Sequence, residues 1–482
     1  MSYVTSEKDY KKIIWVLGLN NFLRGICQSV IIPGLLWTIL KLKVDDSWFL
    51  LGVALFESCQ ILGKLIIYVN HSLAFSKSAY IKFLLTGLLA SSLYILCFYE
   101  VGLMIFQLSL ALQGFWIGSL DRIEGILVNE SNYATGEQDL EYMKMAKCVG
   151  LIFGPILGYF GHLLTDISIL GYEVYNLSIP GFIQFVCCFI MILIYCIVRF
   201  EIFTPSSLLP PSGHHHFNRT ESLALGNASL QLSKVIDKAH LQIFTAFLIF
   251  IAFSFSKAIR EVALPVLTIN QSNIFDKCKC GTTFELDGVY LGFAGVALFE
   301  TLGMFATYRM KNSIENKYQI FLPLILGFTG QVLMISYSRI SLEMLAAGFA
   351  LQGFSMSMGM VIAGNMLHEI IGNDPPAHFT AVGMSLELLG SLLGPFWTIQ
   401  AYMVKCSLCF SLISFFVAVA ILLMLVSICM PVESSDNEIF NTDEMPKRSQ
   451  TKRKPQLMHR TTTDIRKYPI NESEMVNLKK VF

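Results

Sequence analysis

The stretch Gly52 to Ser58, GVALFES, returns almost letter for letter as GVALFET at Gly295 to Thr301. Each copy lies in an apolar run and carries one glutamate, Glu57 or Glu300. Two further pairs keep nearly the same separation, namely ALQGF at 111–115 and 350–354, and GLIFGP at 150–155 with GSLLGP at 390–395. Matches at one fixed separation indicate an internal duplication. The chain is therefore predicted to consist of two similar halves in tandem.

The composition is typical of an integral membrane protein. Hydrophobic residues make up 54% of the chain and charged residues 15%, whereas soluble domains contain about 25% charged residues. The formal net charge is zero, which argues against a nucleic-acid partner. The start, MSYVTSEKDYKK, is polar, and the apolar run after it is too long for a signal-peptide core. Membrane lipid is the expected surrounding, and a monomer is the expected state.

Twelve apolar stretches can cross about 30 Å of hydrocarbon, which takes roughly 20 helical residues. The first half has six, near 13–40, 48–68, 81–99, 102–126, 143–164 and 179–198. The second half has six, near 241–266, 288–308, 319–337, 342–366, 379–402 and 406–430. The predicted fold class is an all-α membrane protein with a pseudo-symmetric six-plus-six bundle. The predicted domains are a cytosolic N-terminus (1–12), two six-helix bundles (13–198 and 241–430), a cytosolic linker (199–240) and a disordered cytosolic tail (431–482).

Basic residues set the expected orientation. Lys8, Lys11 and Lys12 precede the first span, and Lys and Arg recur throughout the tail. Positive charge favours the cytosolic side, so both termini are predicted to be cytosolic. The sequons at Asn176 and Asn270 then fall on the outer side, and glycosylation is predicted there. The linker histidines 214–216 have no Cys or carboxylate at ligand spacing, so neither a metal site nor a cofactor is expected.

Charged residues inside the spans are placed unevenly. The third, sixth, ninth and twelfth spans carry none in their cores. A charge at mid-membrane costs roughly 2.5 to 3.5 kcal/mol, so it normally faces a cavity or a partner. We therefore expect four peripheral spans around eight that line a central path. Candidate coupling or buried charges are Glu57, Lys147, Lys257, Glu261, Glu300 and Glu387.

These features resemble the major facilitator superfamily of transporters. The twelve spans, the linker after the sixth and the charge-free third spans carry the resemblance, which covers roughly residues 13 to 430. The segment GLIFGPILGYFG looks like the family's glycine-proline motif on the fifth span. Small residues four apart allow close helix approach and proline bends the helix. The predicted packing motif is Gly150, Gly154, Pro155 and Gly158, with Gly390, Gly394 and Pro395 in the second half.

Two departures from the family bear on mechanism. The usual charged motif between the second and third spans is nearly absent, since Gly63 leads into KLIIYVNHSLAFSKS. The arginine of the proton-coupling pattern is replaced by Leu110, so proton coupling is not implied. Pro33, Trp37, Phe49 to Gly52, Gly114 and Gly118 resemble, loosely, the lysosomal facilitator family linked to a neuronal ceroid lipofuscinosis. That resemblance implies an endolysosomal membrane protein transporting anions or small metabolites.

Each buried charged residue has two possible roles, either in a structural ion pair within the bundle or in transport. Lys257 and Glu261 are four residues apart, which favours a structural pair. Glu57 and Glu300 have no opposite charge at helical spacing, and Arg24 and Lys147 are their expected partners. The two glutamates are either coupling carboxylates or members of inert salt bridges between helices.

Arg24 is the first candidate for substrate contact. A guanidinium binds a carboxylate, phosphate or sulfate bidentately, and the neighbouring amides would add hydrogen bonds. The wider set of candidate substrate contacts is Asn21, Arg24, Gln28, Arg122 and Arg260, with Gln113 and Gln352 as either pore-lining groups or inter-helix hydrogen bonders. An anionic substrate is predicted.

Four cysteines are expected on the outer side of the membrane. Cys278 and Cys280 fall in the loop after the seventh span, and Cys406 and Cys409 open the twelfth. An oxidising lumen favours one or two disulfides among them, with a four-thiol metal site as the alternative.

The sequence thus predicts a secondary transporter of a small anionic solute that works by alternating access. An anion channel of the same fold and a transporter-like scaffold or receptor are the alternatives. No nucleotide-binding loop or catalytic motif is recognisable, so no enzyme activity is expected.

Overall fold

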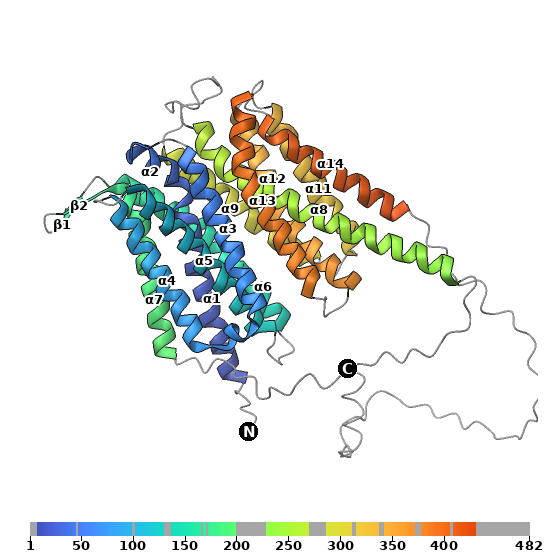
Figure 1. The fold of residues 1–482 in the computed structure, drawn as a ribbon, viewed down its shortest axis with the longest axis horizontal. Coiled ribbons are helices and arrows are strands. Elements are labelled where there is room, and N and C mark those ends of the chain that lie inside the picture. Colours follow the sequence, from blue (N-terminus) through green and yellow to red (C-terminus); the bar gives the residue numbers. More distant parts are fainter. Residues whose placement is uncertain are drawn as a thin grey trace, which may run out of the picture. The chain divides into compact units, whose positions relative to one another are not determined.

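A computed structural model describes residues 7–44, 47–98, 102–129, 136–164, 167–169, 172–198, 228–268, 286–310, 315–336, 342–371, 377–404 and 408–429. Within these ranges the chain is almost entirely helical (Figure 1). Eleven helices are long and apolar enough to cross a membrane. The twelfth span, Phe321–Ser336, is apolar but shorter. The predicted twelve-span fold class is confirmed.

The first bundle contains the first six spans. The first span is broken, because α1 stops before Pro33 and a short 3-10 turn with this proline precedes α2. Proline cannot donate the backbone hydrogen bond that an uninterrupted helix needs. The elements of this bundle are α1 (Glu7–Val30), η1 (Ile32–Gly34), α2 (Leu35–Lys41), α3 (Ser47–Val69), η2 (His71–Phe75), α4 (Lys77–Leu96), α5 (Gly102–Asn129), α6 (Gly136–Leu163), η4 (Asn176–Ser178) and α7 (Ile179–Val198).

A small antiparallel hairpin lies between α6 and α7, and the all-helical prediction missed it. Strands β1 (Ile167–Ile169) and β2 (Tyr172–Val174) pair in the register Ile167 with Val174. Both strands are only three residues long, and the two-residue connection between them is typical of a hairpin.

The second bundle contains the other six spans. Its helices are α8 (Ala228–Thr268), α9 (Leu286–Met310), α10 (Asn316–Gln319), α11 (Phe321–Ser336), α12 (Leu342–Ile371), α13 (Ala377–Val404) and α14 (Leu408–Cys429). Helix α8 begins well before the predicted start of the seventh span at residue 241, so it extends into the sequence expected to be linker. At 1.5 Å per residue, the sixteen-residue α11 is about 24 Å long.

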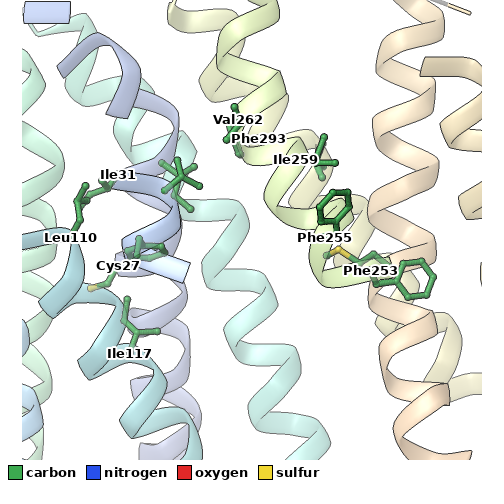
Figure 2. Close-up of a cluster of buried hydrophobic side chains, with 14 of the residues drawn as sticks. Cys27, Ile31, Leu110, Ile117, Phe253, Phe255, Ile259, Val262 and Phe293 are labelled. Atoms are coloured by element: carbon green, nitrogen blue, oxygen red, sulfur yellow. The ribbon is translucent and has the colours of Figure 1, made fainter. Parts of the chain in front are cut away.

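The two bundles repeat one packing scheme. In the first, α1 packs on α6 and α3 on α5; in the second, α8 packs on α13 and α9 on α12. The bundles meet where α6 packs on α9 and α3 packs on α13. Helices α4, α7, α11 and α14 have their principal contacts within their own bundle, as expected for the charge-free spans. Figure 2 shows buried apolar side chains of the first bundle, among them Cys27 and Leu110, and a separate group on α8 with Phe293 of α9.

Glycines of the predicted motif lie where helices come closest. A Cβ on Gly150 would overlap the carbonyl oxygen of Phe22, and one on Gly154 would overlap Ser29 Oγ. A Cβ on Gly158 would meet the ring of Tyr290, which belongs to the other bundle. In the second half, a Cβ on Gly394 would lie 2.6 Å from Ala258 Cβ, which is closer than van der Waals contact. Helix α6 therefore packs backbone to backbone on α1 and at Gly158 also accommodates α9.

Candidate functional site

Four charged side chains form a closed group inside the first bundle, here called the N-bundle cluster: Arg24, Asp121, Glu124 and Lys147. Arg24 Nη2 lies 3.0 Å from Asp121 Oδ1 and 2.8 Å from Glu124 Oε2. Lys147 Nζ lies 2.7 Å from Asp121 Oδ2. Two positive and two negative charges balance one another. The cluster joins α1, α5 and α6, and it requires no further ion for neutrality.

Polar neighbours complete the N-bundle cluster around Glu124. Asn21 Nδ2 donates to Glu124 Oε2 at 2.7 Å, and the Tyr80 hydroxyl donates to Glu124 Oε1 at 2.7 Å. Arg24 also donates to Asn21 Oδ1. The Arg24 side chain is only 1% exposed, although its Nε and Nη1 have no hydrogen-bond partner among the described residues. The structure thus places Arg24 and Asn21 between helices of one bundle.

A second group lies where the bundles meet and is here called the cavity cluster: Glu57, Lys257, Arg260, Glu261 and Glu300. Lys257 Nζ lies 2.6 Å from Glu57 Oε2 and 3.6 Å from Glu261 Oε1. Arg260 Nη1 lies 2.6 Å from Glu300 Oε1. The group has three carboxylates and two cationic side chains. It is therefore not balanced by its own members.

Helical spacing on α8 brings the cavity cluster together. Lys257, Arg260 and Glu261 follow one another at i, i+3 and i+4, so they share one face of the helix. Glu300 comes from the repeated GVALFET stretch on α9, and Glu57 comes from the matching GVALFES stretch on α3. The duplication thus supplies one carboxylate from each bundle.

Several buried polar atoms of this region have no hydrogen-bond partner in the described part of the chain. They include Arg260 Nε, Glu261 Oε2, Glu57 Oε1 and Gln28 Oε1. The close approach of Arg260 Nη1 to Glu300 Oε1 is an ion contact without hydrogen-bond geometry. Arg260 and Glu261 are 4% and 3% exposed. Buried polar groups are usually hydrogen-bonded, so these atoms are available to water or to a polar ligand.

A small cavity of about 60 Å³ is bordered by Arg260, Glu261 and Gln28 of this set. Its polar lining is Gln28, Ser29, Lys257, Arg260, Glu261 and Glu300. Its apolar lining is Ile32, Leu151, Pro155, Phe293, Val296 and Ala297. Residues of α1 and α6 from the first bundle thus face α8 and α9 from the second.

Among the described residues, two ion pairs connect the bundles. The first is Glu57 of α3 with Lys257 of α8, and the second is Lys64 of α3 with Glu387 of α13 at 3.5 Å. Lys64 is absent from the predicted set, although it lies seven residues after Glu57 and therefore on the same face of α3. The seven-residue spacing was the signal that could have identified it.

The predicted partners of the repeated glutamates are wrong. Glu57 pairs with Lys257 and Glu300 with Arg260, whereas Arg24 and Lys147 are held by Asp121 and Glu124 of their own bundle. Lys257 does contact Glu261, but its closer partner is Glu57. The choice of partner depends on which helices face each other. The sequence of a single helix does not carry that information.

The other candidate substrate contacts lie elsewhere. Arg122 is positioned over the ring of Tyr68 at 5.2 Å. Gln113 Nε2 donates to Ser109 Oγ at 3.2 Å, and Gln113 Oε1 accepts from Gln184 Nε2 at 3.3 Å. Gln352 Nε2 donates to the Ser256 carbonyl oxygen at 3.2 Å. Of the predicted set, Gln28 and Arg260 are the two that line the cavity.

The predicted outer-side modifications have different outcomes. Cys409 is buried at the start of α14, and since its predicted partners lie outside the described residues, the disulfides stay a prediction. Asn176 begins η4, half-buried, with Nδ2 3.3 Å from His162 Nδ1. Asn270, Cys278, Cys280 and Cys406 lie outside the described residues. Among the residues described, no group of three or more His, Cys, Asp or Glu side chains could hold a metal ion.

Comparison with solved structures identifies the fold. No protein-family model matches the chain, and the search of curated proteins gives no match. A bacterial homologue of the human lysosomal transporter Spinster, in an inward-facing and unoccupied conformation, gives a TM-score of 0.60 at 12% identity, over 88% of this chain and 97% of the other. The human organic anion transporter MFSD10 (TETRAN) gives 0.56 at 16% identity, over 86% and 99%. The nucleoside transporter NupG gives 0.57 at 12% identity, over 87% and 99%. The chain shares its fold with these transporters.

Proposed function

We propose that this protein is a secondary transporter of a small solute with an anionic group, and that it works by alternating access. The observation that carries the proposal is the cavity between the bundles, with a buried guanidinium, Arg260, in its wall. Charged side chains inside a membrane protein usually mark the path of a substrate or ion. One of the structures with this fold is named as an organic anion transporter.

Arg260 takes the role that the sequence suggested for Arg24. Its Nε has no hydrogen-bond partner among the described residues, and its Nη1 has only the ion contact with Glu300. A carboxylate, phosphate or sulfate could accept from Nε and Nη at once, displacing Glu300. Arg24, by contrast, already faces two carboxylates within its own bundle. We therefore assign anion contact to Arg260 and inter-helix packing to Arg24.

The ion pairs between the bundles fit a rocking mechanism. Alternating access in transporters built from repeats is largely rigid-body rocking of one repeat against the other around a fixed site. Glu57–Lys257 and Lys64–Glu387 are cross-bundle contacts that such a movement would have to lengthen or exchange. Lys257 also faces Glu261, 3.6 Å away, which offers it a second partner on its own helix.

Uptake by purified protein in liposomes tests the proposal. The panel would contain labelled lactate, 4-methylpentanoate, L-leucine and inorganic phosphate. Wild-type protein should take up at least one, and Arg260→Ala should abolish that uptake, with Arg260→Lys retaining part of it because a point charge replaces the planar fork. Arg309→Lys is a matched control, since Arg309 lies at the end of α9 over Phe305.

Other outcomes would replace the proposal. Currents far above transporter turnover would indicate an anion channel, and an absence of flux for every solute would favour a scaffold or receptor. Uptake that is unaffected by Arg260→Ala would refute the assignment of the site.

The endolysosomal membrane with both termini cytosolic is proposed as the location. The loose resemblance to a lysosomal family supports the compartment, and the basic residues near both ends of the chain support the orientation. Colocalisation of the tagged protein with lysosomal markers, and loss of sugar on Asn176→Gln, are the expected results. Sugar on Asn218 or Asn227 would contradict this orientation.

A further inference from the structure

We infer that the solute carries a protonated amine as well as its anionic group, so that it enters the cavity as a zwitterion. The inference rests on the proposed function and names the class of solute for the same site. It follows from the charge balance of the cavity cluster, from the kind of atoms left without partners, and from the apolar part of the wall.

The charge balance disfavours a solute with a net negative charge. Glu57, Glu261 and Glu300 supply three carboxylates, and Lys257 and Arg260 supply two cationic groups. Buried charges are normally paired. A purely anionic solute would add to the excess of negative charge, whereas a zwitterion has no net charge and leaves that excess unchanged.

The N-bundle cluster provides an internal comparison. It also contains two cationic side chains, Arg24 and Lys147, but these face two carboxylates and the count is equal. The additional carboxylate therefore belongs to the cavity cluster, of which Lys257, Arg260, Glu261 and Glu300 line the cavity. With the anionic group of the ligand at Arg260, its ammonium group would lie among the carboxylates of this cluster.

The unpartnered atoms are mostly acceptors. Glu261 Oε2 and Gln28 Oε1 are buried in the cavity wall and have no donor among the described residues. Glu57 Oε1 adds a third acceptor beside Lys257. An ammonium group has N–H donors and no acceptor, so it suits these oxygens. Arg260 Nε is an unpartnered donor of the same cluster and would hold the anionic end.

The apolar part of the cavity wall indicates the chemical nature of the rest of the solute. Leu151 and Ile32 face the cavity from the first bundle, and Phe293, Val296 and Ala297 face it from α9. Apolar surface on the ligand is stabilised by burial against such side chains. The solute class is thus an amino acid, or a closely similar amino-carboxylate, with an aliphatic substituent.

Three probes of matched shape separate the possible solutes. L-leucine has the amine, the carboxylate and the aliphatic group; 4-methylpentanoate lacks the amine; 3-methylbutan-1-amine lacks the carboxylate. Initial uptake of each would be measured with purified full-length protein in liposomes. L-leucine should enter at least about tenfold faster than either of the others, because each deletion leaves a buried charged group of the site unpaired.

The variant Glu261→Gln tests the part played by the carboxylate. It removes the charge and retains the shape, so L-leucine uptake should fall by about tenfold or more while 4-methylpentanoate uptake stays equal or rises. Retained uptake of 4-methylpentanoate also shows that the variant is folded. Glu343→Gln, at an exposed carboxylate on α12, is the matched control and should leave the ratio of the two solutes unchanged.

The outcomes distinguish failure of this inference from failure of the proposed function. Equal uptake of L-leucine and 4-methylpentanoate by wild-type protein would overturn the inference and leave anion transport intact. Equal uptake of L-leucine and 3-methylbutan-1-amine would overturn the anionic group as well. If none of the three probes enters, the inference is wrong, and the other anions of the panel decide the proposed function separately.

Discussion

At the scale of single residues, the two charged clusters differ in their charge counts and in whether they lie within one bundle or join both. The composition of each cluster could be read from the sequence in part, since all its members are charged residues within predicted spans. Their partners could not, because Glu57 and Glu300 occupy equivalent places in the repeat yet pair in different ways. Glu57 reaches across to Lys257 of the other bundle, and Glu300 stays with Arg260 of its own.

Arg24 gives a prediction at this scale. Arg24→Ala should lower the thermal stability of the purified protein substantially, because removing one partner of a buried ion pair costs about 3–5 kcal/mol. Glu124 would be left buried with hydrogen bonds from Asn21 and Tyr80 but without its arginine. The measurement is the melting temperature in detergent. Arg24→Lys should recover part of the loss.

One specific result would contradict the assignment of Arg24 to inter-helix packing. If Arg24→Ala leaves the melting temperature unchanged and abolishes binding of an anion, then Arg24 contacts substrate and the assignment to inter-helix packing fails. Arg122→Ala serves as the comparison, since Arg122 contacts the Tyr68 ring and lies outside the N-bundle cluster.

At the scale of helices, hydropathy predicts where the membrane spans lie but not how far a helix continues beyond its span. The apolar runs predicted twelve spans because burial in lipid requires every backbone group to be satisfied within the helix. The first turns of α8, with sequence ASLQLSKVIDKAH at 228–240, are too polar to register as a span, so hydropathy places them in the linker. The repeated glycines predicted close helix packing correctly at Gly150 and Gly154, since these positions approach the backbone or side chains of α1.

Gly150 and Gly125 form a matched pair for testing helix packing. Gly150→Ala should destabilise the protein by about 1–3 kcal/mol, because its Cβ would overlap the Phe22 carbonyl oxygen. Gly125→Ala has no atom within 4 Å of its Cβ, so it should stabilise α5 by up to about 1 kcal/mol. Urea or thermal unfolding in detergent measures both. Equal effects of the two substitutions would show that α1 and α6 are not in the described contact.

At the scale of the whole membrane domain, the bundles meet through contacts that must change if the protein rocks. Cys148 Sγ on α6 lies 3.0 Å from Met304 Sδ on α9, and Tyr290 of α9 packs on Gly34 and Gly158 of the first bundle. The arrangement of six helices in each bundle could be predicted from the repeat. Which helices of one bundle face the other could not be derived from hydropathy, and contacts such as Lys64 with Glu387 appear only in the folded protein.

A cross-link between the bundles should therefore stop transport. Met304→Cys places a second thiol opposite Cys148, and a short thiol-specific cross-linker or mild oxidation should join α6 to α9. After cleavage at a protease site engineered within residues 201–227, the two halves should remain together on a denaturing gel until reductant is added. Cys148→Ser with Met304→Cys is the control. Transport that continues in the fully cross-linked protein would contradict movement between α6 and α9.

Counterflow is the most direct test of the central claim, which is that a solute held by Arg260 is exchanged across the membrane by alternating access. Liposomes containing wild-type protein would be preloaded with the unlabelled panel solute that gives the fastest uptake, and entry of its labelled form would be followed. The account predicts transient accumulation of label above the outside concentration, dependent on preloading and lost in Arg260→Ala. Entry that never exceeds equilibrium, is unaffected by preloading, or persists in Arg260→Ala would contradict it.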